Sequence, residues 1–319
     1  MSYKKELPTR KIAIVGAGFV GATSAYAMII SGISSELVMI DVNKDKLTGE
    51  VMDLMHGASF VKPVQIYAGD YEDAVGADVV LIAAGANQKL GESRLDLVHR
   101  NTAIFNEIVP QVCQACPDAI LMIVTNPVDI LTYVTLKISG FPPSRVIGTG
   151  TVLDSSRFRQ VLSDYLGVAA INVHAYVIGE HGDTEVPVWS LTNVAGVPLE
   201  EYYSKVLGRA GTLERDELFT LVKSAAYEII KGKGATYYAI GLAVRRILEA
   251  VMRDESSILT VSSLVDGVYG LSGLCLSLPS IVNASGVERV LELPLNEAEK
   301  TEFLQSAETV KGIIRELRL

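Results

Sequence analysis

Hydrophobic and polar positions divide the first half of the chain into two kinds of segment. Short apolar runs are typical of strands buried on both faces of a sheet. We expect such strands at residues 11–15, 36–40, 65–67, 78–83 and 119–124. Longer segments between them are expected to be helices, at residues 22–30, 44–59 and 93–116. This order predicts an α/β fold with a doubly wound parallel sheet over residues 1–148.

The second half of the chain has a different pattern. Helices are expected at residues 152–165, 214–231, 235–252 and 296–317. Strand-like runs lie between them, at residues 172–178, 258–264, 275–281 and 287–291. No linker rich in proline or serine precedes this half, so we expect a second, α+β domain over residues 149–319 that packs tightly against the first.

Composition excludes several classes of protein. A chain of 319 residues favours two domains over one. The net charge of −9 argues against nucleic acid as a partner, because phosphate binding needs a basic surface. No apolar run has the length of a signal peptide or a membrane span, so neither secretion nor membrane insertion is expected. Three cysteines argue against a disulfide framework and favour a reducing cytoplasm.

Cys113 and Cys116 form a C-x-x-C pair at the end of a predicted helix. Such a pair has a redox or metal-binding interpretation, and a plain structural one. No second cysteine pair or nearby histidine completes a set of metal ligands. We therefore favour the structural interpretation and predict no metal site.

The first predicted strand leads into a glycine-rich turn, residues 16–21 (GAGFVG). Gly16 permits the tight turn, Gly18 lets the backbone approach a pyrophosphate, and Gly21 lets helix and strand pack closely. Asp41 closes the next strand, where a carboxylate accepts hydrogen bonds from ribose hydroxyls and repels a 2′-phosphate. The pattern predicts a Rossmann dinucleotide-binding fold that takes NAD rather than NADP.

Two further loops lie at the same edge of the predicted sheet. Gly85 and Ala86 follow one strand, and Thr125 and Asn126 follow the next. Ligands bind at the carboxyl ends of strands in open α/β sheets, so a cofactor laid across this edge would meet both loops. Taken without that context, each loop is equally well a plain connection between strand and helix.

One of the four histidines has an unusual setting, in residues 179–183 (GEHGD). Histidine is the natural proton shuttle near neutral pH, with an unperturbed pKa of about 6.5, and a carboxylate such as Asp154 would fix the tautomer of His181. Arg157, three residues after Asp154, has the planar fork that holds a carboxylate with two hydrogen bonds. The alternative is a surface loop with a histidine of no special role.

At this point the whole chain resembles the L-lactate dehydrogenase family, in its bacterial form. The resemblance rests on motifs in the right order and spacing: residues 16–21, 88–94 (QKLGESR), 125–129 (TNPVD), 154–157 (DSSR), 179–183 and 234–238 (GATYY). It implies reversible reduction of pyruvate to L-lactate with NADH, in glycolysis and fermentation.

The resemblance implies roles for individual residues. His181 would be the proton donor and acceptor, with Asp154 as its orienting partner. Arg157 would clamp the substrate carboxylate, and Arg94 would polarise the substrate carbonyl. Gln88 would face the group on substrate C3. Asn126 and Thr236 match the remaining substrate-pocket positions. Positions that contact or approach NAD are Gly16, Gly18, Val20, Gly21, Asp41, Lys46, Tyr71, Gly85, Ala86, Val124, Thr125, Asn126 and Thr149.

Two rival functions have distinct signatures. A malate dehydrogenase would need an arginine at position 88 for the second carboxylate of its substrate, whereas Gln88 is neutral. An NAD-binding protein without catalysis would lack His181, Asp154 or Arg157, and all three are present. Leu90 stands where many relatives have proline, so the loop before Arg94 is expected to have more backbone freedom.

Two residues outside the predicted catalytic set point to regulation. Arg159 follows Arg157 by two, so on a helix it should leave the active site and face outward. His174 lies on the strand-like run 172–178. Alone, both are ordinary surface residues. In bacterial relatives the matching positions bind fructose 1,6-bisphosphate between subunits, and the resemblance also implies a homotetramer.

Overall fold

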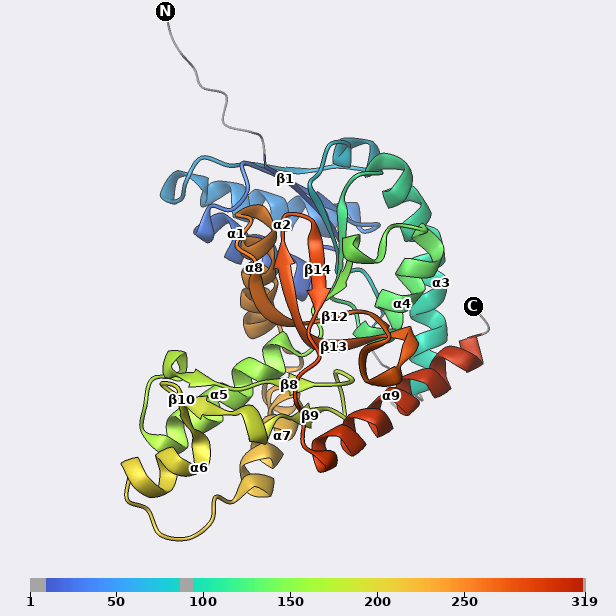
Figure 1. The fold of residues 1–319 in the computed structure, drawn as a ribbon. Helices are drawn as coiled ribbons and strands as arrows, with labels where there is room; N and C mark the ends of the chain where they lie inside the picture. Colours follow the sequence, from blue (N-terminus) through green and yellow to red (C-terminus); the bar gives the residue numbers. More distant parts are fainter. Residues whose placement is uncertain (1–9, 87–93, 318–319) are drawn as a thin grey trace, which may run out of the picture.

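The computed structural model describes residues 10–86 and 94–317 (Figure 1). A nine-stranded sheet runs through the centre, in the order β14-β13-β12-β6-β5-β4-β1-β2-β3. Six of its strands are parallel: β1 (Lys11–Val15), β2 (Glu36–Ile40), β3 (Gln65–Ala68), β4 (Val79–Ile82), β5 (Ile120–Ile123) and β6 (Val146–Gly148). The order 3-2-1-4-5-6 is that of a Rossmann fold, which confirms the predicted fold class.

Helices cover both faces of the parallel strands. Side chains alternate along β1: Ile12 and Ile14 pack with α1 (Phe19–Ser31), α2 (Lys44–His56) and α8 (Tyr238–Met252). Ala13 and Val15 point to the opposite face, with α3 (Arg94–Ala115), α4 (Val128–Ser139) and α9 (Glu297–Leu317). Both faces are therefore buried, which explains why the strands read as unbroken apolar runs.

The longest strands of the second half join the sheet of the first half, while its short strands form two small separate sheets. Its long hairpin β12 (Ser257–Asp266) and β13 (Ser272–Asn283), with β14 (Gly286–Val290), adds three antiparallel strands to the parallel sheet. The junction is β12 against β6, where Ser262 pairs with Gly148. One sheet therefore continues across the domain boundary predicted at residue 148. That boundary rests on the change from parallel to antiparallel strands and not on a break in the sheet.

A smaller lobe lies beyond this hairpin, at the lower left of Figure 1. It contains α5 (Val152–Leu166), α7 (Arg215–Lys233), α6 (Leu199–Glu201) and the strands β10 (Asn193–Val194) and β11 (Val197–Pro198). Its own core is built around Phe158, Trp189 and Phe219, whose rings meet edge to face.

The strand-like run predicted at residues 172–178 is two strands. β7 (Val173–His174) pairs with β10, and β8 (Val177–Ile178) pairs with β9 (Val186–Pro187). The helix predicted from residue 235 begins at Tyr238, because α7 continues to Lys233 and ends at Gly234, whose φ is +84°. That positive φ suits glycine and breaks the helical path.

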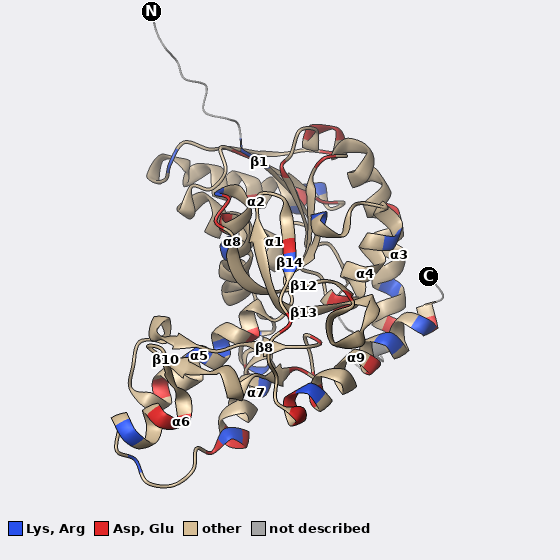
Figure 2. Cartoon of the chain, in the orientation of Figure 1, with Lys and Arg blue, Asp and Glu red and all other residues tan. Residues whose placement is uncertain are grey.

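The structure also bears on the surface charge, on membrane spans and on the cysteine pair. Figure 2 shows basic and acidic residues interspersed along the helices, as on α7 and α9. No helix among the described residues is long and apolar enough to cross a membrane. Cys113 and Cys116 are free thiols, and the Cys116 thiol donates to the Ala74 carbonyl oxygen, 3.0 Å away. Burial raises the pKa of both thiols, which disfavours the reactive thiolate.

Candidate active site

The glycine-rich turn has the backbone shape that a pyrophosphate requires. Gly16 has a φ of +105°, and a Cβ there would lie 2.5 Å from the Ala84 nitrogen. A Cβ on Gly21 would lie 1.9 Å from the Gly16 oxygen, so no larger residue fits. Gly18, by contrast, has nothing within 4 Å of its Cβ position. This open space at the N-terminus of α1 is where a phosphate can approach the backbone.

Asp41, at the end of β2, ties this turn to the neighbouring strand. Its carboxylate accepts hydrogen bonds from the Ala17 N–H at 2.7 Å and the Asn43 N–H at 2.8 Å. A carboxylate has about four lone-pair sites, so acceptor capacity remains for ribose hydroxyls. The residues present therefore fit an adenine dinucleotide without a 2′-phosphate.

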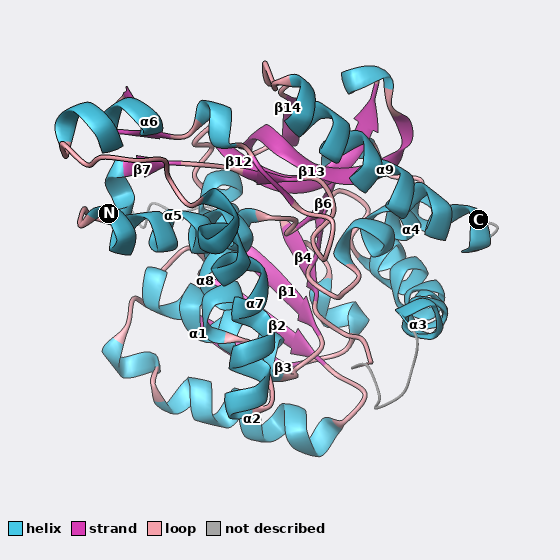
Figure 3. Cartoon of the chain, turned by 90° about the horizontal axis from the view of Figure 1, so that it is seen from below, coloured by secondary structure: helices cyan, strands magenta, loops and turns pink. Residues whose placement is uncertain are grey.

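The other residues predicted to approach NAD follow the same edge of the sheet, seen from below in Figure 3. Val20 and Lys46 lie on the first turns of α1 and α2, and Tyr71 lies on the short helical turn after β3. Val124 and Thr149 follow β5 and β6 and are buried. The topology thus gathers segments that are distant in sequence along one line.

Asn101, which sequence reasoning missed, joins the two loops at this edge. Its side-chain oxygen accepts from the Ala86 N–H at 2.8 Å, and its amide donates to the Asn126 carbonyl oxygen at 2.9 Å. The Thr125 hydroxyl adds a bond to the Ala84 oxygen at 2.8 Å. Gly85 is held between them, since a Cβ there would lie 2.3 Å from Thr125 Cγ2. No sequence signal beyond its place on a helix pointed to Asn101.

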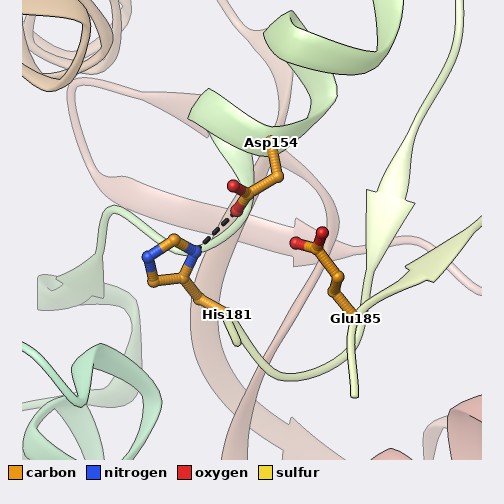
Figure 4. Close-up of side chains that lie close together, drawn as sticks. All are labelled: Asp154, His181 and Glu185. Carbon is orange, nitrogen blue, oxygen red and sulfur yellow. Dashed lines mark hydrogen bonds and ion pairs between the residues drawn. The ribbon is translucent and has the colours of Figure 1, made fainter. Parts of the chain in front are cut away.

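His181, Asp154 and Arg157 come together as a hydrogen-bonded chain. The His181 Nδ1 and an Asp154 oxygen are 2.6 Å apart (Figure 4). The Arg157 guanidinium donates to the other Asp154 oxygen at 2.8 Å. Asp154 is buried on the first turn of α5, while the His181 side chain is 25% exposed. With Nδ1 engaged, Nε2 is the nitrogen left to exchange a proton with a ligand.

Asp129 fixes the backbone of the loop that carries His181, residues 179–185 between β8 and β9, called the histidine loop below. This fully buried carboxylate on α4 accepts from the His181 N–H at 2.7 Å and from the Ser262 hydroxyl at 2.6 Å. The Ser277 hydroxyl lies 3.3 Å from the same Asp129 oxygen that accepts from Ser262. Asp129 thus connects α4, β12, β13 and the loop; the sequence showed it within a motif but assigned it no role.

For both His181 and Asp154, burial and the neighbouring charges shift the pKa in opposite directions. Burial disfavours the His181 imidazolium, but the Asp154 charge and hydrogen bond outweigh it and raise the pKa of His181 to about 9. Burial would raise the pKa of Asp154, yet His181 and Arg157 hold it below its ordinary value. Burial raises the pKa of Asp129 to about 6, so that group is mostly ionised at neutral pH.

These side chains line a pocket of about 540 Å³ between the sheet edge and α7. Asn126 and Pro127 reach it from the cofactor edge, and His181 and Arg157 from the opposite wall. Helix α7 forms one wall and is fastened to the histidine loop: the Tyr227 hydroxyl donates to the Asp183 carboxylate at 3.0 Å. The contribution of α7 was not foreseen from the sequence.

Three predicted substrate residues are not placed in this pocket. Thr236 lies between α7 and α8, outside the described lining. Gln88 lies outside the described residues. Arg94 begins α3, but its side chain is likewise outside the described part.

Of the two residues predicted to bind a regulator, Arg159 contacts the segment that carries His174. The Arg159 guanidinium donates to the Ala175 carbonyl oxygen at 3.0 Å, beside the exposed His174. Arg159 is half-buried with its guanidinium over the Tyr176 ring, 5.6 Å from the centroid, so it is less exposed than its spacing suggested.

Asp154, His181 and Glu185 also place three potential metal-ligand atoms within 4.8 Å of one another. The Arg157 cation beside Asp154 opposes a second cation there, and His181 Nδ1 is already bonded to Asp154. The geometry favours a proton-transfer pair over a metal centre, and the absence of a metal stays a prediction.

The fold and the site together define an NAD-dependent oxidoreductase. The family model for the lactate/malate dehydrogenase NAD-binding domain matches residues 10–148, and that for the α/β C-terminal domain matches residues 151–318. The chain belongs to the lactate/malate dehydrogenase family.

Individual relatives agree over nearly the full length. The chain is 56% identical to the L-lactate dehydrogenase of Acetivibrio thermocellus, over 97% of each chain. It is 53% identical to L-lactate dehydrogenase 1 of Clostridium acetobutylicum, over 94% of this chain and 96% of that one. The crystal structure of the minor L-lactate dehydrogenase of Enterococcus mundtii superposes with a TM-score of 0.94 at 44% identity, covering 98% of this chain and 99% of that one.

Proposed function

We propose that the protein is an L-lactate dehydrogenase that reduces pyruvate to L-lactate, with His181 as the proton donor and acceptor. The observation that carries the proposal is the chain of His181, Asp154 and Arg157 on a pocket that opens toward the NAD edge of the sheet. Names of the relatives support the choice of substrate.

Each group of the chain has a distinct task in this reaction. NADH supplies the hydride that reaches C2 of pyruvate. Arg157 holds the substrate carboxylate and so orients C2. His181 gives its Nε2 proton to the oxygen on C2, and Asp154 stabilises the imidazolium before that transfer. We assign Arg94 to polarising the carbonyl, Gln88 to the C3 methyl side, and Asn126 and Thr236 to the substrate pocket.

The proposal is tested by following NADH absorbance with pyruvate and, separately, with oxaloacetate. A lactate dehydrogenase oxidises NADH faster with pyruvate, whereas a malate dehydrogenase prefers oxaloacetate. An NAD-binding protein without catalysis would bind NADH and leave both substrates unchanged, which would overturn the proposal.

Changing Gln88 to arginine is expected to shift preference from pyruvate toward oxaloacetate. The guanidinium would pair with the second carboxylate, which is costly to desolvate unpaired. The measurement is the ratio of kcat/KM for the two substrates. Gln88→Glu serves as the opposite-charge control and should disfavour oxaloacetate further. An unchanged ratio in Gln88→Arg would remove Gln88 from the assignment.

We further propose that fructose 1,6-bisphosphate binds at Arg159 and His174, between subunits of a homotetramer. Support comes from the hydrogen bond that holds Arg159 beside the exposed His174 on β7. A two-fold axis would double both cations opposite two phosphates. The sugar bisphosphate would shift the equilibrium only by its differential affinity for the active arrangement.

Fructose 1,6-bisphosphate is therefore expected to lower the apparent KM for pyruvate in the wild type and much less in Arg159→Gln. Steady-state kinetics with and without the sugar bisphosphate measure it, and light scattering reports the assembly in parallel. Equal activation of both proteins, or none in the wild type, would contradict the proposed site.

Self-association has independent support on another face. Helices α1, α2 and α8 and the turn after α2 expose large apolar side chains: Tyr26, Ile30, Met52, Met55, Phe60 and Leu242. Exposed large apolar side chains on neighbouring elements are a feature of subunit interfaces, and they support self-association through this face. The cytoplasmic location expected from the cysteines stays a prediction.

A further inference from the structure

The proposed reaction leaves one buried carboxyl group in the pocket without a role. Glu185, at the end of the histidine loop, is 6% exposed and lines the same pocket as His181 and Arg157. Figure 4 shows its carboxyl group directed toward Asp154 and His181. No described residue donates a hydrogen bond to this carboxyl group. A buried carboxylate without a donor is costly, so the site favours the neutral acid.

The charges around Glu185 come from three elements. Asp154 and Arg157 project from α5, His181 belongs to the same loop, and Lys223 projects from α7. Lys223 Nζ donates to the Asp183 carbonyl oxygen at 3.1 Å. Burial first, and then the Asp154 charge, raise the pKa of Glu185 to about 8, against the smaller opposing effects of His181, Lys223 and Arg157.

The charge count of the pocket depends on this group. Three cations line the pocket, namely protonated His181, Arg157 and Lys223, and two ionised acids, Asp154 and Asp183, oppose them. With a neutral Glu185 one positive charge is left, which suits one substrate carboxylate. An ionised Glu185 would cancel that charge in a site of low dielectric constant. Anion binding should then weaken, whatever the protonation of His181.

We propose that Glu185 controls the charge of the substrate pocket: it is a neutral acid when the substrate carboxylate binds, and its ionisation expels that carboxylate. The inference rests on the proposed function, because it takes the ligand to be a 2-oxo monocarboxylate held by Arg157. Glu185 in this view neither touches the reacting atoms nor orients His181.

Oxamate, a non-reacting analogue of pyruvate, separates these effects. Its dissociation constant for the enzyme–NADH complex is measured by fluorescence from pH 6 to 10 in the wild type and in Glu185→Gln. In the wild type, binding should weaken first as Glu185 ionises near pH 8 and again as His181 loses its proton near pH 9. Glu185→Gln should lack the first step and bind oxamate about tenfold more tightly than the wild type at pH 9, relative to pH 6.5.

Lactate oxidation gives a second readout, with the opposite dependence on His181. Neutral His181 favours this direction, so its deprotonation should raise kcat/KM for lactate, whereas ionisation of Glu185 should lower it. Glu185→Gln should remove the alkaline decrease. Glu185→Asp retains a carboxyl group and should retain the alkaline decrease. Glu302 is exposed on α9, so Glu302→Gln should match the wild type.

The outcomes distinguish a failure of the role given to Glu185 from a failure of the proposed function. Parallel pH profiles for the wild type and Glu185→Gln would overturn the role of Glu185, even if oxamate binds both well. A wild type that neither binds oxamate nor reduces pyruvate would overturn the proposed function instead. If Glu185→Gln does not fold, Glu185→Ser removes the same carboxyl group with a smaller side chain and is held to the same criterion.

Discussion

Replacing His181 with alanine is expected to lower kcat for pyruvate reduction by about 100- to 10,000-fold, the usual contribution of a positioned general acid. Asp154 orients the His181 ring at the pocket, and the imidazolium can release a proton near neutral pH, which the Arg157 guanidinium beside it does not. The fold should survive, because Asp154 retains its hydrogen bond from Arg157 at 2.8 Å. Stopped-flow and steady-state assays at saturating NADH measure the loss.

NADH affinity is the internal control for this variant. The glycine-rich turn and Asp41 hold the cofactor edge without any contact with His181, so the dissociation constant for NADH should be unchanged. His99→Ala, an exposed histidine on α3, controls for loss of an imidazole elsewhere. Wild-type turnover in His181→Ala would mean that the proton comes from another group.

The Asp154→Asn variant gives the same assignment a pH signature. Asp154 is the main cause of the raised pKa of His181, about 9. Removing the carboxylate should lower that pKa, so pyruvate reduction, which needs the imidazolium, should decline at a lower pH than in the wild type. Lactate oxidation, which needs the neutral ring, should extend to lower pH.

Replacing Arg157 with glutamine is expected to lower kcat/KM for pyruvate by roughly 30-fold to several thousand-fold. That range corresponds to about 2–5 kcal/mol, the usual cost of removing one partner of a buried charge pair. The side chain is 14% exposed and lies beside the pocket, where little water can replace it. Most of the loss should appear in KM, since the carboxylate is bound before and during the reaction.

Arg157→Lys tests geometry apart from charge. Lysine retains the cation but lacks the planar fork, so it should restore only part of the lost affinity. Arg315→Gln, an exposed arginine on α9, is the matched control and should behave as the wild type. A pyruvate KM in Arg157→Gln within a factor of two of the wild type would remove Arg157 as the carboxylate clamp.

The outcome for individual elements shows where sequence patterns suffice. The central parallel strands were predictable because both faces of these strands contact apolar side chains, as Ile12 and Ala13 do on opposite sides of β1. The end of α7 was misplaced by two residues, because either Gly232 or Gly234 was able to end the helix and only the packed chain selects Gly234. Short strands such as β7 and β8 depend on partners elsewhere, so local periodicity merged them.

The sequence by itself determined the parts of this protein that are local in the chain. The glycine-rich turn, the acid at the end of β2 and the histidine between two glycines each carry their chemistry within a few residues. Only the tertiary structure decided that β12 to β14 extend the parallel sheet, that Asp129 anchors His181 from 52 residues away, and that Glu185 faces Asp154. These relations depend on burial and on electrostatic interactions between distant segments, which a linear pattern does not contain until the chain is packed.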